Sequence, residues 1–284
     1  SYRPTHLLLT GLSWDHFDMY PTEDSYYQAF EKLLKNMPAN GLLVACADSS
    51  NIERVISNSK CQIVAYGKSK GGYLYSQVES NKDGIRFFIE SRDGKFLVSS
   101  PMLGDYMAEN ICGAFALARE IGVPADSIIK SIGEFRGIKR RLEKRGNTSG
   151  KAAVYDDIAH SPVKAKSVLK TLRQVYTGKI FAVFEPNTGN RQSSSIPTYK
   201  EAFDSADEVI VPRLTKIKIN EETKDGVMDE KKLAEVIGKT HKRTDLMEDD
   251  SELVSYLKTA AGPDDAIVFL GSHGFRGMIE TLIR

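Results

Sequence analysis

Two carboxylates and a histidine stand close together where an apolar run gives way to a helical pattern. The segment from Asp156 to His160 follows a strand-like run, and Pro162 suits the first position of a helix. Carboxylates at the end of a strand can accept hydrogen bonds from a ribose or an attacking amine, and His160 can move a proton. The alternative is that Asp156 or Asp157 only caps the helix.

A second cluster follows the first apolar run, within residues 14–18, which read WDHFD. There His16 could hold a divalent metal ion with carboxylate support, or act as a base. Loops that follow strands are where α/β proteins place reactive groups. The structural alternative is a loop histidine that is hydrogen-bonded to a neighbouring carboxylate.

Two further stretches could bind anions. Residues 139–145 read KRRLEKR, the densest basic run, and an arginine there could reach a nucleotide phosphate from between two domains. A charged, solvated linker is the alternative. Residues 271–277 read GSHGFRG at a strand-to-helix turn, where amide groups could meet an anion or serve the structure alone.

The apolar pattern predicts the elements that must position these residues, and it is typical of an α/β fold. In the first half we expect buried strands and a meander of short antiparallel strands, followed by two helices, over residues 7–12, 42–46, 62–66, 71–99, 108–121 and 126–135. The second half reads as a doubly wound unit. Its expected strands cover 152–156, 180–185, 208–211 and 266–270, with helices over 162–176 and 197–205, around 233–237 and over 253–261, and a last helix after 270. We place the domains at 1–140 and 141–284.

The composition excludes several classes of protein. With 39 Lys and Arg against 38 Asp and Glu, the formal net charge is +1, so no field exists to hold a polyanion, and we expect no nucleic-acid partner. We expect no membrane partner either, because no apolar run is long enough to cross a bilayer. The three cysteines lack C-x-x-C spacing, which favours a reducing, cytoplasmic compartment.

In combination and in this order, the motifs resemble the Mur ligase family of ATP-dependent amide-forming enzymes, along essentially the whole chain. The segments that carry the resemblance read TGLSWDHFDMYPTEDSYYQAFEKLL, GDYMAENICGAFALAREIGV and FRGIKRRLEKRG. The resemblance implies part of a P-loop-type central ATPase domain followed by a doubly wound, Rossmann-like C-terminal domain. Within the family, VYDDIAHSPVKAKSVLKTLR, FAVFEPNTGNR and GSHGFRGMIETL are most similar to the murein peptide ligase branch.

That branch joins the tripeptide L-alanyl-γ-D-glutamyl-meso-diaminopimelate to UDP-N-acetylmuramate in peptidoglycan recycling, through an acyl phosphate made from ATP with Mg²⁺. The resemblance implies that His16 contacts the metal, Asn110 the adenine, Arg141 the phosphates and Asp156 the ribose. It places Asp157 and His160 toward the incoming peptide. The alternatives are a UDP-N-acetylmuramate:L-alanine ligase, and a non-catalytic module that binds muropeptides or nucleotides.

The sequence departs from the family pattern at several points. Tyr106 and Met107 replace the usual His-Asn pair, so only Asn110 of that motif is kept, and Ser161 follows His160 where a second histidine is common. The motif G-x-x-x-x-G-K-S/T is absent from the chain. We therefore expect a P-loop, a metal-binding glutamate and a UDP-binding domain in an N-terminal portion that precedes Ser1, so that this chain alone is inactive.

Overall fold

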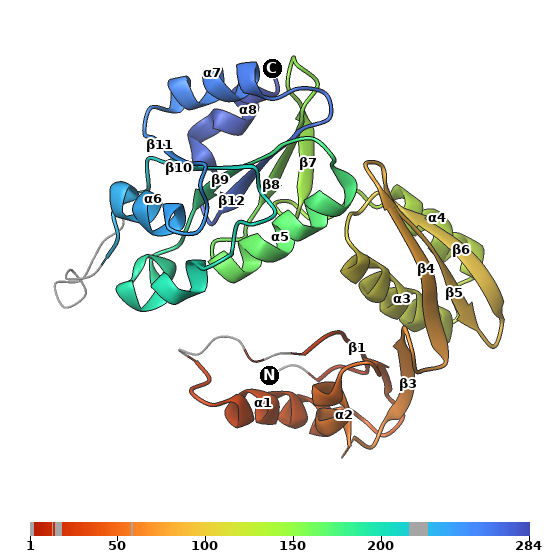
Figure 1. Cartoon of the computed structure of the whole chain (residues 1–284). Coiled ribbons are helices and arrows are strands. Elements are labelled where there is room, and N and C mark those ends of the chain that lie inside the picture. Colours follow the sequence, from red (N-terminus) through yellow and green to blue (C-terminus); the bar gives the residue numbers. More distant parts are fainter. Residues whose placement is uncertain (1–2, 13, 15–18, 58, 216–226) are drawn as a thin grey trace. The chain divides into compact units, whose positions relative to one another are not determined.

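The computed structural model describes residues 3–12, 14, 19–57, 59–215 and 227–284. The chain divides into two compact units, Ser1–Arg136 and Gly137–Arg284. Each unit is a mixed α/β structure built around one six-stranded sheet (Figure 1). The α/β fold class expected from the apolar pattern is thus confirmed.

The sheet of the first unit has the order β1-β2-β3-β4-β5-β6. The pairs β1·β2, β2·β3 and β3·β4 are parallel, whereas β4, β5 and β6 form the expected antiparallel meander. The meander continues the parallel sheet because β4 also pairs with β3. The strands are β1 (His6–Leu9), β2 (Leu42–Cys46), β3 (Gln62–Gly67), β4 (Tyr73–Asn81), β5 (Gly84–Ser91) and β6 (Gly94–Ser100).

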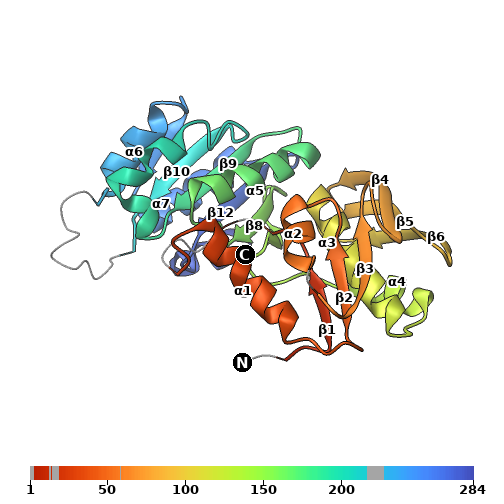
Figure 2. The same ribbon diagram turned by 90° about the horizontal axis from the view of Figure 1, so that it is seen from below.

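The helices in the described part of this unit are α1 (Glu23–Lys35), α2 (Ser50–Ile56), α3 (Asp105–Glu120) and α4 (Ala125–Glu134). Helix α1 begins with a capping box, in which Thr22 and Ser25 satisfy each other's backbone amides. Helices α1 and α2 lie on one face of the sheet and α3 on the other (Figures 1 and 2). Phe115 and Cys112 of α3 are fully buried, so this helix anchors the core.

The second unit has the sheet order β11-β10-β9-β12-β8-β7, in which every pair is parallel except β7·β8. Every residue of β8, β9, β10 and β12 is buried, as expected of a sheet that is covered on both faces. The strands are β7 (Glu143–Asn147), β8 (Ala153–Asp157), β9 (Ile180–Glu185), β10 (Glu208–Pro212), β11 (Thr244–Met247) and β12 (Ala266–Gly271).

Helices cover both faces of this second sheet. In Figure 1, α5 and α6 lie on one face, and α7 and α8 on the other. They are α5 (Pro162–Val175), α6 (Glu230–Gly238), α7 (Asp250–Ala260) and α8 (Met278–Leu282), with short 3-10 helices η1 (Gly189–Arg191), η2 (Ser193–Tyr199) and η4 (Phe275–Gly277). The chain leaves β9 toward the α5 face and leaves β12 toward the α8 face, so a topological switch point lies between these neighbouring strands.

The structure differs from the sequence expectations at three places. The basic run of residues 139–145, for which a charged linker was one alternative, overlaps the edge strand β7, whose charged sequence EKRGN hides it from an apolar-pattern search. The short strand β11 was not expected. The helix expected over 197–205 is replaced by the 3-10 helix η2, in which Pro197 lacks the amide that a regular helix needs.

Among the residues that the structure describes, no helix is both long enough and apolar enough to cross a membrane.

Candidate functional site

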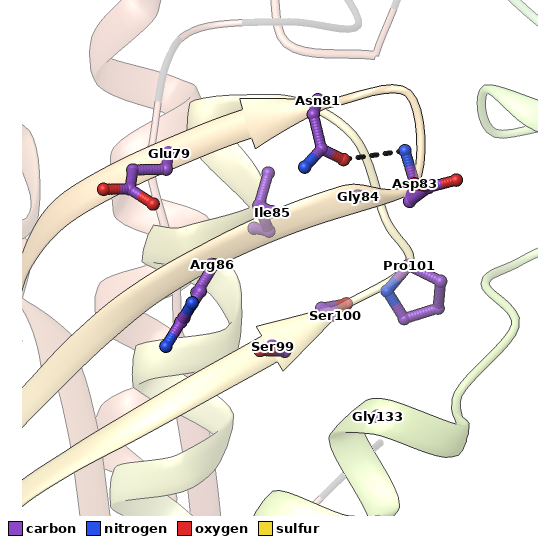
Figure 3. A pocket seen from close by; sticks show the side chains of 10 residues that line it. All are labelled: Glu79, Asn81, Asp83, Gly84, Ile85, Arg86, Ser99, Ser100, Pro101 and Gly133. Atoms are coloured by element: carbon purple, nitrogen blue, oxygen red, sulfur yellow. Dashed lines mark hydrogen bonds between the residues drawn. The ribbon is translucent and has the colours of Figure 1, made fainter.

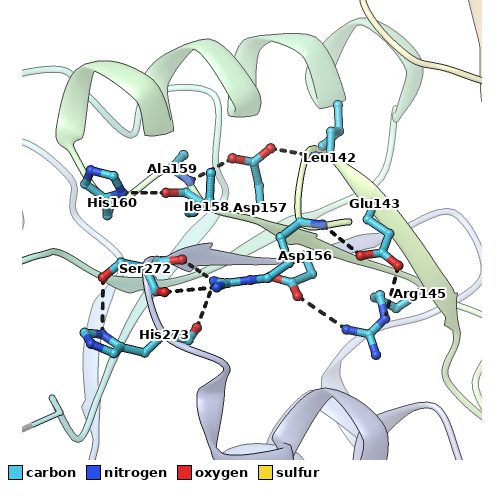
Figure 4. Close-up of polar contacts among 12 residues, drawn as sticks. Leu142, Glu143, Arg145, Asp156, Asp157, Ile158, Ala159, His160, Ser272 and His273 are labelled. Atoms are coloured by element: carbon cyan, nitrogen blue, oxygen red, sulfur yellow. Dashed lines mark hydrogen bonds and ion pairs between the residues drawn. The ribbon is translucent and has the colours of Figure 1, made fainter. Parts of the chain in front are cut away.

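Asp156 lies in β8 and is 2% exposed. Arg140 Nε donates to its Oδ1 at 3.3 Å, and Arg145 Nη1 donates to its Oδ2 at 3.3 Å (Figure 4). Burial raises the pKa of this carboxyl above its ordinary value, and the two arginines oppose that shift. The residue expected at a ribose is therefore held, in this structure, between two guanidinium groups.

Arg140 also holds the loop that follows β12. Its guanidinium donates to the carbonyl oxygens of Ser272 and His273, each at 2.9 Å, and to that of Gly271. One side chain thus connects the start of the second unit with Asp156 and the glycine-containing turn. Sequence reasoning chose the neighbouring Arg141, whose side chain is exposed and whose charge lowers the pKa of Asp157.

Asp157 holds the loop that carries His160. Its Oδ2 accepts from the backbone N–H of Leu142 at 2.6 Å, and its Oδ1 accepts from that of Ala159 at 2.8 Å (Figure 4). Burial raises the pKa of Asp157, and these two backbone hydrogen bonds offset the shift in part. Both oxygens of the carboxylate are therefore committed to the backbone on either side of β8.

His160 is half-buried, and its Nδ1 lies 2.7 Å from the carbonyl oxygen of Ile158. A carbonyl oxygen can only accept, so Nδ1 carries the proton and the lone pair of the neutral ring is on Nε2. The helix that follows is capped by Ser161, whose side chain accepts from Lys164 N. This excludes the alternative that Asp156 or Asp157 is the cap of α5.

The structure thus brings Asp156, Asp157, Arg141 and His160 together at the carboxyl end of β8 and the adjoining start of β7.

Asn110 belongs to α3 of the first unit and is half-buried. It lines a mainly apolar pocket of about 420 Å³, whose walls include Met107, Phe115, Ile132 and Phe135. A side-chain amide both donates and accepts hydrogen bonds, as the edge of a purine does. An apolar slot with one such amide fits a flat heteroaromatic ring.

The expected metal contact, His16, lies outside the described residues, as do Asp15 and Asp18. Within the described ranges, no group of three or more His, Cys, Asp or Glu side chains is placed so that it could hold a metal ion. Trp14, just before this segment, donates from Nε1 to the Tyr20 carbonyl oxygen at 3.0 Å.

A cluster at the carboxyl ends of β9 and β12 joins two side chains of the GSHGFRG turn to Glu185, which the sequence analysis did not single out. Glu185, the last residue of β9, is 1% exposed, and its Oε1 accepts from Thr215 N at 2.8 Å. His273 Nδ1 lies 3.6 Å from Oε1, and Arg276 Nη1 lies 3.7 Å from Oε2. Arg276 also binds Asp250 with two hydrogen bonds of 2.8 and 2.7 Å, which lower the pKa of Asp250.

A separate polar pocket of about 410 Å³ lies where the β4–β5 hairpin meets the end of β6 (Figure 3). Glu79 and Arg86, which are paired in the register of β4 and β5, line its rim. Gly84 has a φ of 138°, and a Cβ there would lie 2.0 Å from the Ser100 carbonyl oxygen, so only glycine fits. None of the residues that the sequence singled out lines this pocket.

Each of the two units matches a domain of known proteins. Residues 1–118 match the Mur ligase middle domain, and residues 140–273 match the domain described as Mur ligase, glutamate ligase domain. A UDP-N-acetylmuramate--L-alanine ligase from Caldicellulosiruptor bescii is 31% identical over 213 residues, which are 74% of this chain and 47% of that protein. The chain spans about half the length of the curated relatives it matches.

Solved structures share the fold. The UDP-N-acetylmuramate-alanine ligase of Thermotoga maritima has a TM-score of 0.76 at 21% identity, covering 99% of this chain and 59% of its own. A murein peptide ligase from Psychrobacter arcticus has a TM-score of 0.60 at 22% identity, covering 99% of this chain and 57% of its own. With both of its units matched in order by domains of one family, the chain belongs to the Mur ligase family.

Proposed function

We propose that this chain supplies the middle and C-terminal parts of an ATP-dependent ligase that joins L-alanine to UDP-N-acetylmuramate. The observation that carries the proposal is the match of both units to Mur ligase domains, with the polar cluster of Asp156, Asp157 and His160 at a strand end of the second. The named relative with 31% identity is an L-alanine ligase, which supports that acceptor.

This choice of acceptor changes the expectation drawn from the motifs after β8, β9 and β12. Those motifs favoured the tripeptide, but the curated relatives compared carry the L-alanine name. The tripeptide remains a second candidate because a murein peptide ligase does share the fold.

The proposed reaction has two steps. A carboxylate oxygen of UDP-N-acetylmuramate attacks the γ-phosphorus of ATP, and ADP leaves. The amine of the acceptor then attacks the acyl carbon of the acyl phosphate, phosphate leaves and the nitrogen loses a proton. Magnesium, when bound, would neutralise phosphate charge, although no three His, Cys, Asp or Glu side chains gather into a metal site among the residues that the structure describes.

In this proposal, the residues of the chain bind and position the reactants. The apolar pocket at Asn110 receives the adenine ring, and Arg141 offers an exposed guanidinium to the phosphates. Asp156 is assigned to the ribose, which would share its oxygens with Arg140 and Arg145. Asp157 fixes the loop so that His160 Nε2 can accept a proton on the acceptor side.

A coupled assay of phosphate release tests the function in the full-length protein that carries this chain. With ATP, Mg²⁺ and UDP-N-acetylmuramate present, we expect release that depends on L-alanine, with the amide product seen by mass spectrometry. Release with the tripeptide alone would establish the second candidate and overturn L-alanine. Binding of ATP without release for either acceptor would overturn the ligase in favour of a non-catalytic nucleotide-binding module.

A further inference from the structure

Arg140 and Arg145 hold Asp156 by unequal contacts. Arg140 donates from Nε to Oδ1 at 3.3 Å, and its other nitrogens donate to three backbone carbonyl oxygens. Arg145 donates from Nη1 to Oδ2 at 3.3 Å (Figure 4). Strong hydrogen bonds between a guanidinium and a carboxylate are shorter, about 2.7–2.9 Å, so both contacts to Asp156 are weak ones. Arg140 is nevertheless anchored, because the backbone holds its remaining nitrogens.

Arg145 has a second carboxylate that binds it more closely. Its Nη2 donates to Oε1 of Glu280 in α8 at 2.8 Å, a length typical of a strong ion pair. The side chain of Glu280 is 46% exposed, whereas that of Asp156 is 3% exposed. Arg145 therefore lies between a buried carboxylate that it holds loosely and an exposed carboxylate that it holds closely.

The backbone at Arg145 departs from regular strand pairing. The register of β7 with β8 shifts between Lys144 and Gly146, so Arg145 is the extra residue of a β-bulge. Strand β7 is also the edge strand of its sheet. Bulges at sheet edges re-aim a side chain and are frequent beside active sites. The bulge therefore directs Arg145 toward Asp156 from a position that has no paired residue across the sheet.

A ribose must compete with a guanidinium for Asp156. The carboxylate is buried beneath both arginines, so sharing it with a sugar hydroxyl requires that one arginine withdraws from its oxygen. Withdrawal of Arg140 would leave three carbonyl oxygens without their donor, which is costly. Withdrawal of Arg145 costs less, because Glu280 keeps the guanidinium paired at the surface.

We propose that Arg145 is an exchangeable partner of Asp156, which a ribose hydroxyl of the nucleotide replaces while Glu280 retains the guanidinium. Asp156 Oδ2 then accepts from the hydroxyl, and Oδ1 keeps its contact with Arg140. Arg145 and Glu280 are positioning residues, which decide how readily Asp156 selects a nucleotide that carries a ribose diol. The inference rests on the proposed function, because it takes Asp156 as the residue that meets the ribose.

The two residues of the exchange predict opposite effects. ADP and 2′,3′-dideoxy-ADP are titrated by calorimetry into the full-length protein that carries this chain. The ratio of their dissociation constants, the preference for ADP, reports the contribution of the ribose hydroxyls. Arg145→Ala frees Asp156 Oδ2, so the preference should rise at least threefold. Glu280→Gln leaves Asp156 as the closest carboxylate to Arg145, so the preference should fall at least threefold.

Arg92→Ala is the matched control. Arg92 also pairs with two carboxylates, those of Asp93 and Glu120, but it lies in the first unit. Its substitution should change the preference for ADP less than about 1.5-fold. Because the preference is a ratio of two dissociation constants measured on one sample, a variant of which only a part folds still reports it.

A purely structural ion pair predicts a different pattern. If Arg145 and Glu280 only stabilise the second unit, both variants shift the preference in the same direction or leave it unchanged, and the exchange is overturned. Equal affinity of the unmodified protein for both nucleotides, or no binding of ADP, would overturn it as well, because Asp156 would then not meet the ribose.

Failure of the exchange and failure of the function are distinguishable. Opposite shifts in a protein that never releases phosphate would leave the exchange standing and remove the ligase. Phosphate release that depends on L-alanine, together with shifts in the same direction, would remove the exchange and leave the ligase.

Discussion

Arg140 and Asp156 form the central pair of the second unit, with Arg140 Nε donating to Asp156 Oδ1 at 3.3 Å. The other nitrogens of the same guanidinium donate to the carbonyl oxygens of Gly271, Ser272 and His273. Arg140 precedes β7, Asp156 lies in β8, and the three carbonyls lie at and just after the end of β12, so the pair connects three segments that are separate in the sequence. We therefore expect this pair to affect the free energy of unfolding.

Arg140→Ala leaves a buried carboxylate with only Arg145 beside it and three carbonyl oxygens without their donor. We expect a loss of about 3 kcal/mol in the free energy of unfolding, the low end for breaking a buried ion pair, because Arg145 remains. Urea denaturation followed by circular dichroism measures it. Arg141→Ala is the control, since that side chain is exposed and should cost less than about 0.5 kcal/mol. Equal losses for both variants would contradict the structural role of Arg140.

How far the sequence predicts this fold depends on where each strand lies. LLVAC in β2 and AIVFLG in β12 are continuous apolar runs because both faces of the sheet are covered there, and they were found from hydrophobicity alone. Strand β7 lies at the edge, pairs only with β8 and carries charges, so its signal resembles that of a solvated loop. Whether such a segment forms a strand depends on its pairing with another strand, and that pairing cannot be read from the segment's own sequence.

The residues of the candidate site also differ in how easily the sequence reveals them. Asp156, Asp157 and His160 are neighbours in the chain, so their cluster was visible as a motif. Glu185 and Arg276 lie on different elements, and only the register of β9 with β12 brings them together. The only sequence signal for Glu185 was a glutamate at the end of an apolar run.

Arg141 was assigned to the phosphates from the family resemblance, and the basic run by itself gives no sign of the contacts of Arg140. Arg140 has a φ of 59°, in the left-handed region, and its side chain contacts Asp156 of β8.

Asp157→Ala removes the acceptor of two backbone amides, those of Leu142 and Ala159. Leaving these buried donors unpaired should cost about 2 to 4 kcal/mol in unfolding free energy, at about 1 to 2 kcal/mol for each. Asp157→Asn keeps one acceptor oxygen and should cost about half as much. Native-state hydrogen exchange at the two amides is the direct measurement. Unchanged protection at both amides in Asp157→Ala would show that the carboxylate does not hold this loop.

The pH dependence of stability should have opposite signs at Asp250 and Asp157. Hydrogen bonds from Arg276 lower the pKa of Asp250 in the folded state, so its contribution is present above the ordinary carboxyl pKa and is lost as the pH falls through the folded value. Burial raises the pKa of Asp157, so its contribution is present below the ordinary carboxyl pKa and is lost as the pH rises through the raised value.

Denaturation midpoints measured from strongly acidic pH, below the ordinary carboxyl pKa of 3.8, up to neutral pH separate the contributions of Asp250 and Asp157. Asp250→Asn should reduce the loss of stability on acidification, and Asp157→Asn should reduce the loss on raising the pH above the acidic range. Parallel curves for both variants and the unmodified protein would contradict these assignments.

The pocket beside Asn110 should bind the adenine ring of the nucleotide. Asn110→Ala removes an amide that can pair with the purine edge, and loss of about 1.4 kcal/mol should weaken ADP binding about tenfold. Ala114 lines the same pocket, so Ala114→Leu should fill it and weaken ADP binding as strongly while leaving the amide in place.

Lys130→Ala is the control on α4, because Lys130 is outside the lining. Fluorescence titration with ADP measures all three variants. If Asn110→Ala weakens binding but Ala114→Leu does not, the amide contacts the nucleotide from outside this pocket, and the placement of the adenine ring in the pocket is wrong.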